Sequence, residues 1–327
     1  LRQPKPEAYS ESIPTTGPDG PVFHSGSHQK QQDTMYPRTS MEPPPVTRLY
    51  PATGEQLPLK GLYLQHQLHL RGKAGRPFVY SNFVTSLDGR IALGNPDSTT
   101  HSVPAAIANA RDWRLYQELA GQADLIVSSG RYFRQSSIGE EQDHLPVARQ
   151  AAFADIHAWR QTQGLHAQPD IAILSGSLNI PVETLKPYAT RRIFIFTGDD
   201  SDPQRASALQ AAGAEVIRAG SGIRVDGSRM INELAALGYR SIYAIAGPDV
   251  FHTLLTARAI DRLYLSITQQ LLGGTEYDTL VQGPLLSPAQ GMSLLSLYHD
   301  PYAPEHAGQL LASFESRDRA TGNYSCS

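Results

Sequence analysis

Cysteine is almost absent from this sequence. Its single cysteine, Cys326, stands next to the C-terminal residue. One cysteine excludes an intrachain disulfide and any zinc site built from several cysteines. The sequence also has no apolar run of the roughly 20 residues that a transmembrane helix needs, and residues 1–12 lack the apolar stretch of a signal peptide. We therefore expect a cytoplasmic protein that does not bind a membrane.

Positive charge is also modest and scattered. The 28 Lys and Arg residues stand against 31 Asp and Glu residues, which gives a net charge of −3. Proteins that bind nucleic acid or anionic membranes carry basic patches, so the composition argues against both partners. The 11 histidines are dispersed. His66 and His69 lie three residues apart but have no carboxylate or cysteine beside them, so we predict no metal site.

Large aliphatic residues are rare in residues 1–45, which are rich in Pro, Ser, Gln, Thr and Gly. Such a segment cannot bury enough apolar surface to offset the entropy lost on ordering. We predict a disordered N-terminal tail over 1–45. Aliphatics return over 46–76 in short pieces cut by Pro and Gly, which favours an extended arm that packs on the domain. The folded domain is predicted to span 77–320.

Short apolar segments alternate with helical patterns from Phe78 onward. The predicted strands are 78–85, 124–128, 171–174, 192–196, 214–218, 242–246, 260–267 and 309–316. The predicted helices are 102–120, 146–163, 203–212, a segment around 230–237 and one that follows Gly247, with a polar loop over 131–145. This alternation predicts an α/β domain with a mostly parallel central sheet flanked by helices, followed by a C-terminal β extension.

The stretch from Ser241 to Gly274 reads as strand, glycine turn, helix and strand. Gly247 and Pro248 end the first strand, and Asp249 is expected to cap the helix. A glycine at the end of a buried strand allows a phosphate to come close, and a helix N-terminus directs free N–H groups at it. The stretch therefore fits a phosphate site. It also fits an ordinary strand-to-helix turn.

Small polar residues follow five predicted strands, at 86–88, 128–130, 175–177, 197–198 and 247–249. Carboxyl ends of parallel strands meet at one edge, where this architecture binds ligands. Together the five loops predict a nucleotide-type ligand that carries the chemistry itself, although each alone fits plain turn chemistry. The glycines of GSGIRVDG (220–227) have the wrong spacing for a dinucleotide fingerprint, so we interpret them as a loop.

Four segments resemble the pyrimidine reductase family of riboflavin biosynthesis. This family comprises the reductase half of the bacterial bifunctional deaminase-reductase and the free-standing archaeal and fungal reductases. The matching segments are SNFVTSLDGRIAL (81–93), ADLIVSSGRYF (123–133), the strand–loop–helix–strand run 213–244, and IAGPDVFHTLLTARAIDRLYLSITQQLLGG (245–274). The resemblance spans about residues 77–316.

The resemblance implies a dihydrofolate-reductase-like α/β fold that binds NADPH and forms a homodimer. It implies reduction of 5-amino-6-(5-phosphoribosylamino)uracil by hydride transfer to C1′ of the opened ribose. Carried over by position, the residues that contact NADPH are Val84, Ser128, Ser129, Gly130, Ser175, Gly247, Pro248, Asp249 and Val250. Those near the substrate are Asn82, Ser86, Asp88 and Ser98. No catalytic proton donor is identified.

The sequence departs from the family at the substrate side. Ile245 stands where the family has a Glu, and Arg131 where it has a Thr. Leu119 and Ala120 replace a substrate-binding Arg, for which Arg114 is the candidate substitute one turn earlier. The phosphate-binding DDPxLxxR segment is not recognisable in RQSSIGEEQDHLP (134–146).

Three functions therefore remain open. The first is an NADPH-dependent reductase of riboflavin biosynthesis without the deaminase half. The second is an NADPH reductase of another small carbonyl or imine substrate. The third is a non-catalytic NADP-binding module. Dihydrofolate reductase itself is disfavoured, because no apolar carboxylate for a folate site can be placed in the sequence.

Overall fold

The computed structural model describes most of the chain beyond the N-terminal region. The described residues are 42–94, 100–139, 144–304 and 306–317. The predicted disordered tail falls almost wholly on 1–41, and Ser98 lies in 95–99, so both predictions concern residues outside the described part.

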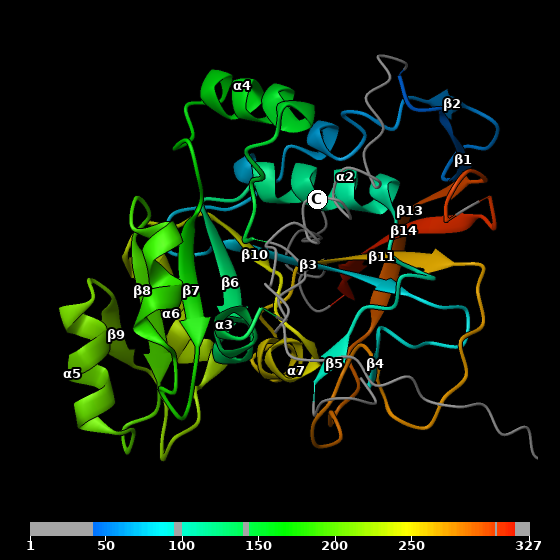
Figure 1. The fold of residues 1–327 in the computed structure, drawn as a ribbon. Helices are drawn as coiled ribbons and strands as arrows, with labels where there is room; N and C mark the ends of the chain where they lie inside the picture. The colour runs from blue at the N-terminus through cyan, green and yellow to red at the C-terminus, as the bar shows by residue number, and fades with distance from the viewer. Residues whose placement is uncertain (1–41, 95–99, 140–143, 305, 318–327) are drawn as a thin grey trace, which may run out of the picture. The chain divides into compact units, whose positions relative to one another are not determined.

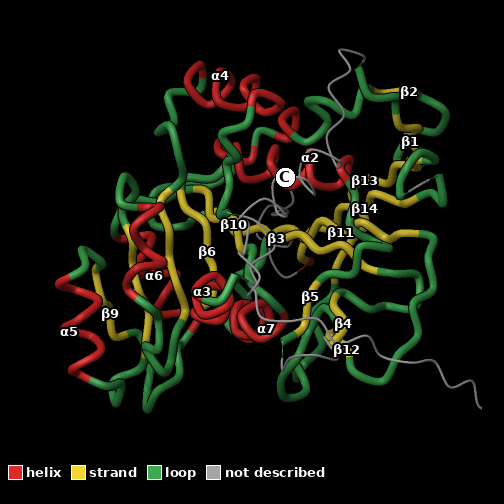
Figure 2. The backbone as a smooth tube through the Cα atoms, viewed as in Figure 1, coloured by secondary structure: helices red, strands yellow, loops and turns green. Residues whose placement is uncertain are grey.

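Within the described residues, eleven strands form one sheet in the order β2-β1-β13-β14-β11-β3-β10-β6-β7-β8-β9 (Figures 1 and 2). Every pairing from β11 through β3, β10, β6, β7 and β8 to β9 is parallel. The pairings from β2 to β11 are antiparallel. The strands are β1 Val46–Tyr50, β2 Gln56–Leu57, β3 Phe78–Thr85, β6 Leu125–Ser129, β7 Asp170–Leu174, β8 Ile193–Thr197, β9 Glu215–Arg218, β10 Ser241–Ala244, β11 Arg262–Thr268, β13 Met292–Asp300 and β14 Gln309–Ser316.

A small second sheet joins β12 (Tyr277–Asp278), β4 (Ala92–Gly94) and β5 (His101–Ser102). The helices are α2 Ala110–Gly121, α3 Gly130–Ser137, α4 Ala154–Thr162, α5 Pro203–Ala211, α6 Gly227–Ala236 and α7 Pro248–Thr256. Short 3-10 helices are η1 Leu64–His66, η2 Leu68–Leu70, η3 Ala151–Phe153 and η4 Val182–Tyr188.

Two predicted helix boundaries and one predicted loop are wrong. The helix expected from residue 102 begins at Ala110, because the Asn109 side chain accepts hydrogen bonds from the backbone N–H groups of Arg111 and Asp112. The loop expected over 131–145 contains α3, which buries Phe133 completely against Tyr188. One buried aromatic side chain in a polar segment gives no helical periodicity of apolar residues, so the sequence does not predict this helix.

The helix expected over 146–163 is also shorter than predicted, because α4 covers only its second half. The N–H groups of Val147 and Ala148 donate to the side-chain amide oxygens of Gln168 and Gln117. These acceptors replace helical carbonyls and hold the backbone outside a helix.

The two faces of the parallel strands bury different side chains, because successive residues of a strand point to opposite faces. On one face, Val79 and Phe83 of β3 join a hydrophobic cluster with α6 and α7, and the Phe83 ring lies 5.0 Å from that of Phe251. On the other face, the Tyr80 hydroxyl donates to the Leu119 carbonyl of α2. The α2 face of the sheet, defined here as the side of β3, β10 and β11 that faces α2, is therefore distinct from the α6–α7 face (Figure 1).

The segment 46–76, expected as an arm, contributes β1 and β2 to the edge of the main sheet, where β1 pairs with β13. Its leucines are deeply buried, with Leu59 and Leu62 each 1% exposed and Leu68 fully covered. Burial of this extent stabilises the fold by roughly 1.5–3 kcal/mol per side chain.

Candidate functional site

A cavity of about 220 Å³ opens at the carboxyl ends of β6, β7 and β10. Seven of the nine residues expected to contact NADPH line it, namely Ser129, Gly130, Ser175, Gly247, Pro248, Asp249 and Val250. The other two, Ser128 and Val84, lie on β6 and β3 and are not part of its lining. Because the carboxyl ends of parallel strands meet at one edge of the sheet, residues more than a hundred positions apart in the sequence lie together at this cavity.

Two helices begin at this cavity without a side-chain cap. Ser129 precedes α3 and Gly247 precedes α7, and neither helix receives a side-chain hydrogen bond at its N-cap. Of the other described helices, α2, α5 and α6 are capped by the side chains of Asn109, Asp202 and Asp226, while α4, which does not border the cavity, also has no side-chain cap. The first N–H groups of an α-helix have no partner within the helix, so uncapped N-termini that meet in one cavity suit an anion.

The predicted cap at Asp249 is wrong. The N-cap of α7 is Gly247, Pro248 takes the first helical position and Asp249 lies in the first turn. Proline is favoured at that position because its missing N–H would have no helical partner there. The Asp249 carboxylate lines the cavity together with the cationic Arg131 and Arg134.

The two glycines at the cavity have different surroundings. A Cβ at Gly130 would lie 2.8 Å from the Ser175 hydroxyl oxygen, which is too close for an ordinary side chain. A Cβ at Gly247 would meet no protein atom within 4 Å, so a side chain there would enter open space. Gly130 is itself buried, so glycine there allows close packing against Ser175, whereas the backbone at Gly247 is open to whatever occupies the cavity.

Ser175 carries a hydroxyl group that is buried and has no hydrogen-bond partner among the described residues. Buried polar atoms are nearly always paired, so such an atom calls for an explanation. Because Ser175 lies on the cavity wall, a ligand hydroxyl or phosphate oxygen would satisfy it.

A second cavity of about 1000 Å³ shares Leu174, Ser175, Gly176, Asp249 and Val250 with the first. It extends along α6 and α7 under the segment 282–290, and the predicted 220–227 loop borders it. Arg224 and Arg229 contribute positive charge to its wall. The Arg229 guanidinium lies 3.8 Å from the Asp199 carboxylate, and both side chains are exposed. An exposed ion pair of this kind is weak, so Arg229 is only weakly bound to Asp199.

The residues expected near the substrate lie in two places. Asn82 is on the α2 face of the sheet, where its amide oxygen accepts a hydrogen bond from the Tyr243 hydroxyl. Ser86 and Asp88 lie in the turn after β3, where the Ser86 hydroxyl donates to the Asp88 carboxylate.

The Asp88 carboxylate is already engaged by the protein. It accepts hydrogen bonds from the N–H groups of Leu272 and Gly273 and pairs with Arg90 at 2.6 Å. The bonds from Ser86 and from Gly273 lower the pKa of Asp88 to about 2. Asp88 therefore stays ionised and ties the β3 turn to the glycine pair after β11.

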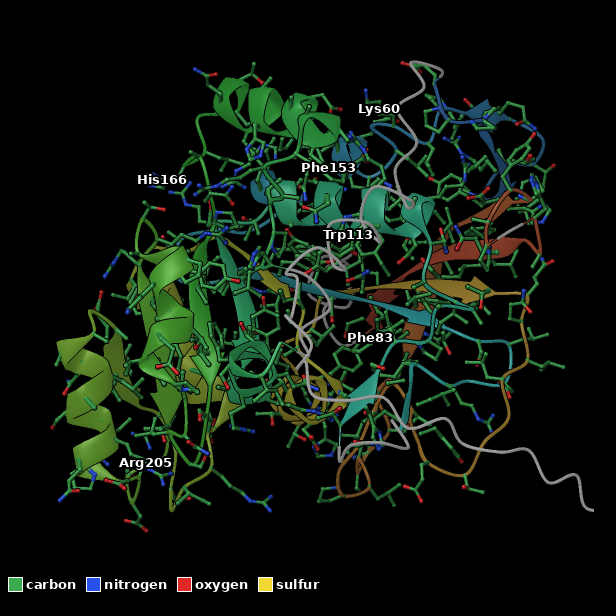
Figure 3. All side chains as sticks on the ribbon, in the orientation of Figure 1. Lys60, Phe83, Trp113, Phe153, His166 and Arg205 are labelled. Atoms are coloured by element: carbon green, nitrogen blue, oxygen red, sulfur yellow. The ribbon has the colours of Figure 1, made fainter. Side chains whose placement is uncertain are left out.

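Burial on the α2 face decreases toward the carboxyl ends of the strands. Tyr80 is fully buried, while Asn82 and Val84 further along β3 are partly exposed. Ile245, just past β10, and Trp113 on α2 are also partly exposed. Figure 3 labels Trp113 between α2 and β3, and its indole stacks on Tyr116 at 4.8 Å. This end of the face is open enough to be reached.

One carboxyl group on this face was missed from the sequence. Asp112, in the first turn of α2, accepts a hydrogen bond from the Ser266 hydroxyl of β11. Burial of the carboxyl group raises the pKa of Asp112 to about 6, against the lowering effect of the Ser266 bond. The misplaced helix start hid Asp112, because it turned a first-turn residue into a mid-helix one.

Arg114 is not available as a substitute for the family's substrate-binding Arg. Its guanidinium donates to the Glu118 carboxylate at 2.8 Å and to the Asp155 carboxylate at 2.6 Å. Glu118 is itself buried and accepts hydrogen bonds from the N–H groups of Gly61 and Tyr63. Arg114 thus joins α2, α4 and the 58–64 segment.

Arg131, which replaces the family's Thr, lines the first cavity and lies 3.7 Å from the Asp278 carboxylate. His101 contacts the same carboxylate at 2.9 Å. These side chains connect the cavity wall to the small β12–β4–β5 sheet.

None of the helices in the described residues is long and apolar enough to cross a membrane.

Residues 77–300 match the family model described as the RibD C-terminal domain. Among solved structures, a pyrimidine reductase-like protein from Corynebacterium diphtheriae is 21% identical, with a TM-score of 0.57, and the match covers 73% of this chain and 92% of that chain. RibD of Acinetobacter baumannii is 14% identical, with a TM-score of 0.50 and coverage of 74% of this chain and 58% of that chain. No curated protein matches significantly.

At sequence identities of 21% and 14%, the similarity to these solved structures supports the fold and not the function. The predicted class is confirmed: the fold is a dihydrofolate-reductase-like α/β fold with a mostly parallel central sheet and a C-terminal β extension, which β13 and β14 form.

Proposed function

The chain belongs to the RibD C-terminal domain family, and on that premise we propose that it is an NADPH-dependent reductase of 5-amino-6-(5-phosphoribosylamino)uracil in riboflavin biosynthesis. When bound, NADPH supplies a hydride, here to C1′ of the opened ribose. The single observation that carries the proposal is the cavity between the uncapped N-termini of α3 and α7, with the unpaired Ser175 hydroxyl on its wall.

The residues at this cavity fit the pyrophosphate of a dinucleotide. Gly247 leaves the backbone open, and the uncapped N–H groups of two helices supply donors with a positive dipole end. The Ser175 hydroxyl would gain the partner that it lacks. Arg131 and Arg134 add positive charge on the same wall.

The larger adjoining cavity supports NADPH over NADH. The two cofactors differ by the 2′-phosphate on the adenosine ribose, and a phosphate is bound most strongly by guanidinium groups. Arg224 and Arg229 lie on this wall beside Ser221 and Ser228, whose hydroxyls are further donors. We therefore expect the adenosine half of the cofactor in the larger cavity.

The substrate would lie on the open end of the α2 face. Asn82 and Val84 lead to this end from β3, and the turn that Asp88 holds closes its far side. Asn82 is positioned by the Tyr243 hydroxyl, so its free amide N–H groups can bind a carbonyl of a pyrimidine ring.

A second candidate is a reductase of another small carbonyl or imine compound. Ile245 removes the family's carboxylate from the substrate side, and Arg114 is occupied by Glu118 and Asp155. Both observations weaken the recognition of a ribosylamino-pyrimidine phosphate. A pocket without polar partners rejects a ligand that carries extra polar groups only by factors of about 10², so less polar carbonyl and imine compounds compete for this site.

The test is NADPH oxidation by the purified chain with 5-amino-6-(5-phosphoribosylamino)uracil, followed by loss of reduced-nicotinamide absorbance and by mass spectrometry of the product. We expect a product two hydrogens heavier and no turnover with Gly247→Val. NADPH binding without turnover of this uracil, but with turnover of other imines, would favour the second candidate. Binding without any turnover would favour a non-catalytic NADP-binding module.

The resemblance to this family also implies a homodimer in the cytoplasm. Sedimentation equilibrium of the purified chain tests the first point directly. A mass of twice 35.7 kDa is expected, and a concentration-independent monomer would contradict it.

A further inference from the structure

Asp112 holds a carboxyl group whose placement the fold does not explain. Other buried acids around α2 are matched by a cation: Asp300 by Arg111 and Glu118 by Arg114. Within the described residues, the Asp112 carboxyl group accepts one hydrogen bond from Ser266 and forms no ion pair with Lys, Arg or His. Asp112 is partly exposed. A partly buried acid without a cation still costs stability, and acids in such surroundings are concentrated at functional sites.

The position of Asp112 follows from the strand register. Ser266 of β11 pairs in parallel register with Val84 of β3, so the two side chains share the α2 face. Asn82 lies two residues earlier on the same face and is bonded to Tyr243 of β10. The Asp112 carboxyl group is therefore one strand away from Val84 and faces the end of the sheet where burial decreases. Figure 1 shows α2 lying over these strands.

The other titratable groups that face this carboxyl group do not titrate near neutral pH. Tyr63 comes from the segment before η1, and Tyr243 comes from β10. Burial raises the pKa of both phenols well above the usual value. On α2 itself, Arg111 is bound to Asp300 and Glu118 to Arg114. Asp112 is thus the group of this set that exchanges a proton in the range where a metabolic reductase works.

We propose that Asp112 is the acid that protonates the substrate nitrogen during reduction, and that Ser266 is the residue that positions it. The proposal rests on the reductase function proposed above. Reduction of a C=N bond needs a hydride on carbon and a proton on nitrogen. Bound NADPH would supply the hydride and be oxidised to NADP⁺, and the Asp112 carboxylic acid would donate the proton and become a carboxylate. Water returns a proton to the carboxylate after the product leaves.

The chemical class of the substrate follows from this assignment. An acid beside Trp113, Tyr116 and Tyr243 suits a flat, nitrogen-rich ring that stacks on aromatic side chains and accepts a proton at an adjoining imine nitrogen. A simple ketone would need its proton on oxygen and offers no surface for stacking.

The experiment compares Asp112→Asn and Ser266→Ala with the wild-type chain, using NADPH and 5-amino-6-(5-phosphoribosylamino)uracil. For Asp112→Asn we expect kcat to fall by about 100-fold or more, with the Kd for NADPH within about twofold of wild type. The wild-type kcat should fall as the pH rises through the Asp112 pKa, and Asp112→Asn should lose this limb. Because the Ser266 bond lowers the pKa, Ser266→Ala should move the limb to higher pH with a smaller loss of kcat.

A direct titration supplies a readout that does not need turnover. Carbon-13 NMR of the aspartate carboxyl groups, assigned with Asp112→Asn, follows the Asp112 pKa in the NADP⁺ complex. A raised pKa that changes when the uracil is added supports the proposal. A value in the ordinary aspartate range, or one that ignores the uracil, overturns it.

The two levels of failure are distinguishable. If the wild-type chain does not bind NADPH, the proposed function fails. If it binds and turns over substrate while Asp112→Asn keeps its kcat and its pH profile, the assignment of Asp112 fails and the function stands. Thermal unfolding of each variant without ligand shows whether it is folded.

Discussion

At the scale of single residues, Ser175 links an unmet hydrogen bond to ligand binding. Its hydroxyl is buried and has no hydrogen-bond partner in the part of the chain that the structure describes. Replacing it with Ala removes a buried polar atom that costs the folded chain about 1–3 kcal/mol. We therefore expect Ser175→Ala to melt at the same or a higher temperature and to bind NADPH about tenfold more weakly. Calorimetric titration and thermal unfolding check both results, and weaker folding with unchanged binding would contradict them.

Asp112, like Ser175, is expected to lower the stability of the folded chain while it serves the proposed function. Its folded pKa of about 6 lies above the value of an unfolded aspartate. An acid with a raised pKa stabilises the fold only while protonated, so this contribution is present below the unfolded pKa and is lost as pH rises toward 6. Asp112→Asn cannot ionise. It should be more stable than wild type by about 1–3 kcal/mol at about pH 8.

The difference should shrink toward about pH 5, where wild-type Asp112 is largely protonated. Urea unfolding at the two pH values measures it. A variant that is less stable than wild type at the higher pH would show that the charged carboxylate has a stabilising partner, and would remove the physical basis for its role as an acid.

The sequence could predict site residues whose position follows from their immediate neighbours in the chain. Gly130, Ser175 and Gly247 were found because each follows a buried strand, and the ends of parallel strands converge. Asp112 could not be found in this way. Its environment depends on where α2 begins and on Ser266, which lies more than 150 residues later in the chain. Tertiary contacts of this kind leave no periodic trace in the sequence.

At the scale of elements, α2 is attached to its neighbours by buried charges. Arg114 joins Glu118 and Asp155, and Glu118 holds the N–H groups of Gly61 and Tyr63. Burial raises the pKa of Glu118, and Arg114 opposes that rise. Arg114→Ala would leave a buried carboxylate without a cation, which typically costs about 3–5 kcal/mol.

We expect Arg114→Ala to be destabilised by this amount, and more at high pH than at low pH, because Glu118 must then be protonated to stay buried. The double variant Arg114→Met with Glu118→Gln should recover much of the loss. Urea unfolding checks both. If Arg114→Ala is instead as stable as wild type but has a raised KM for the phosphorylated substrate, Arg114 contacts substrate after all.

The elements also show why some predictions failed. Strands such as β3 and β14 were predicted with their observed bounds, since an apolar, β-branched or aromatic run between turn residues marks a strand directly. The helix α3 was missed because Phe133 is its main buried side chain in a polar segment. Packing against Tyr188 stabilises it, and this contact is invisible in sequence.

At the scale of the whole molecule, the sheet joins a parallel part, whose strand ends border the two cavities, to an antiparallel edge. The edge includes β1, which adds to β13 from a segment outside the matched residues 77–300. The parallel character of the central strands followed from alternating strands and helices, but their order did not. The incorporation of β1 did not, because its pairing partner lies some 250 residues away.

Two truncations separate the tail from this edge. Removing residues 1–41 should leave the melting temperature and its rise with NADPH unchanged, because that composition buries little apolar surface. Removing residues 1–57 also deletes β1 and β2, including the fully buried Val46. That variant should melt several degrees lower. A large drop for the shorter truncation would contradict the predicted disordered tail.

Isothermal titration with NADPH, and separately with NADH, tests the central claim most directly. The measurement uses the wild-type chain and Gly247→Val, whose added side chain meets no protein atom within 4 Å at Cβ and should leave the fold intact. We predict saturable NADPH binding, at least about tenfold weaker NADH binding because Arg224 and Arg229 meet the 2′-phosphate, and no binding by the folded variant. Absence of binding to either cofactor, or unimpaired binding by Gly247→Val, would contradict the claim that this cavity holds NADPH.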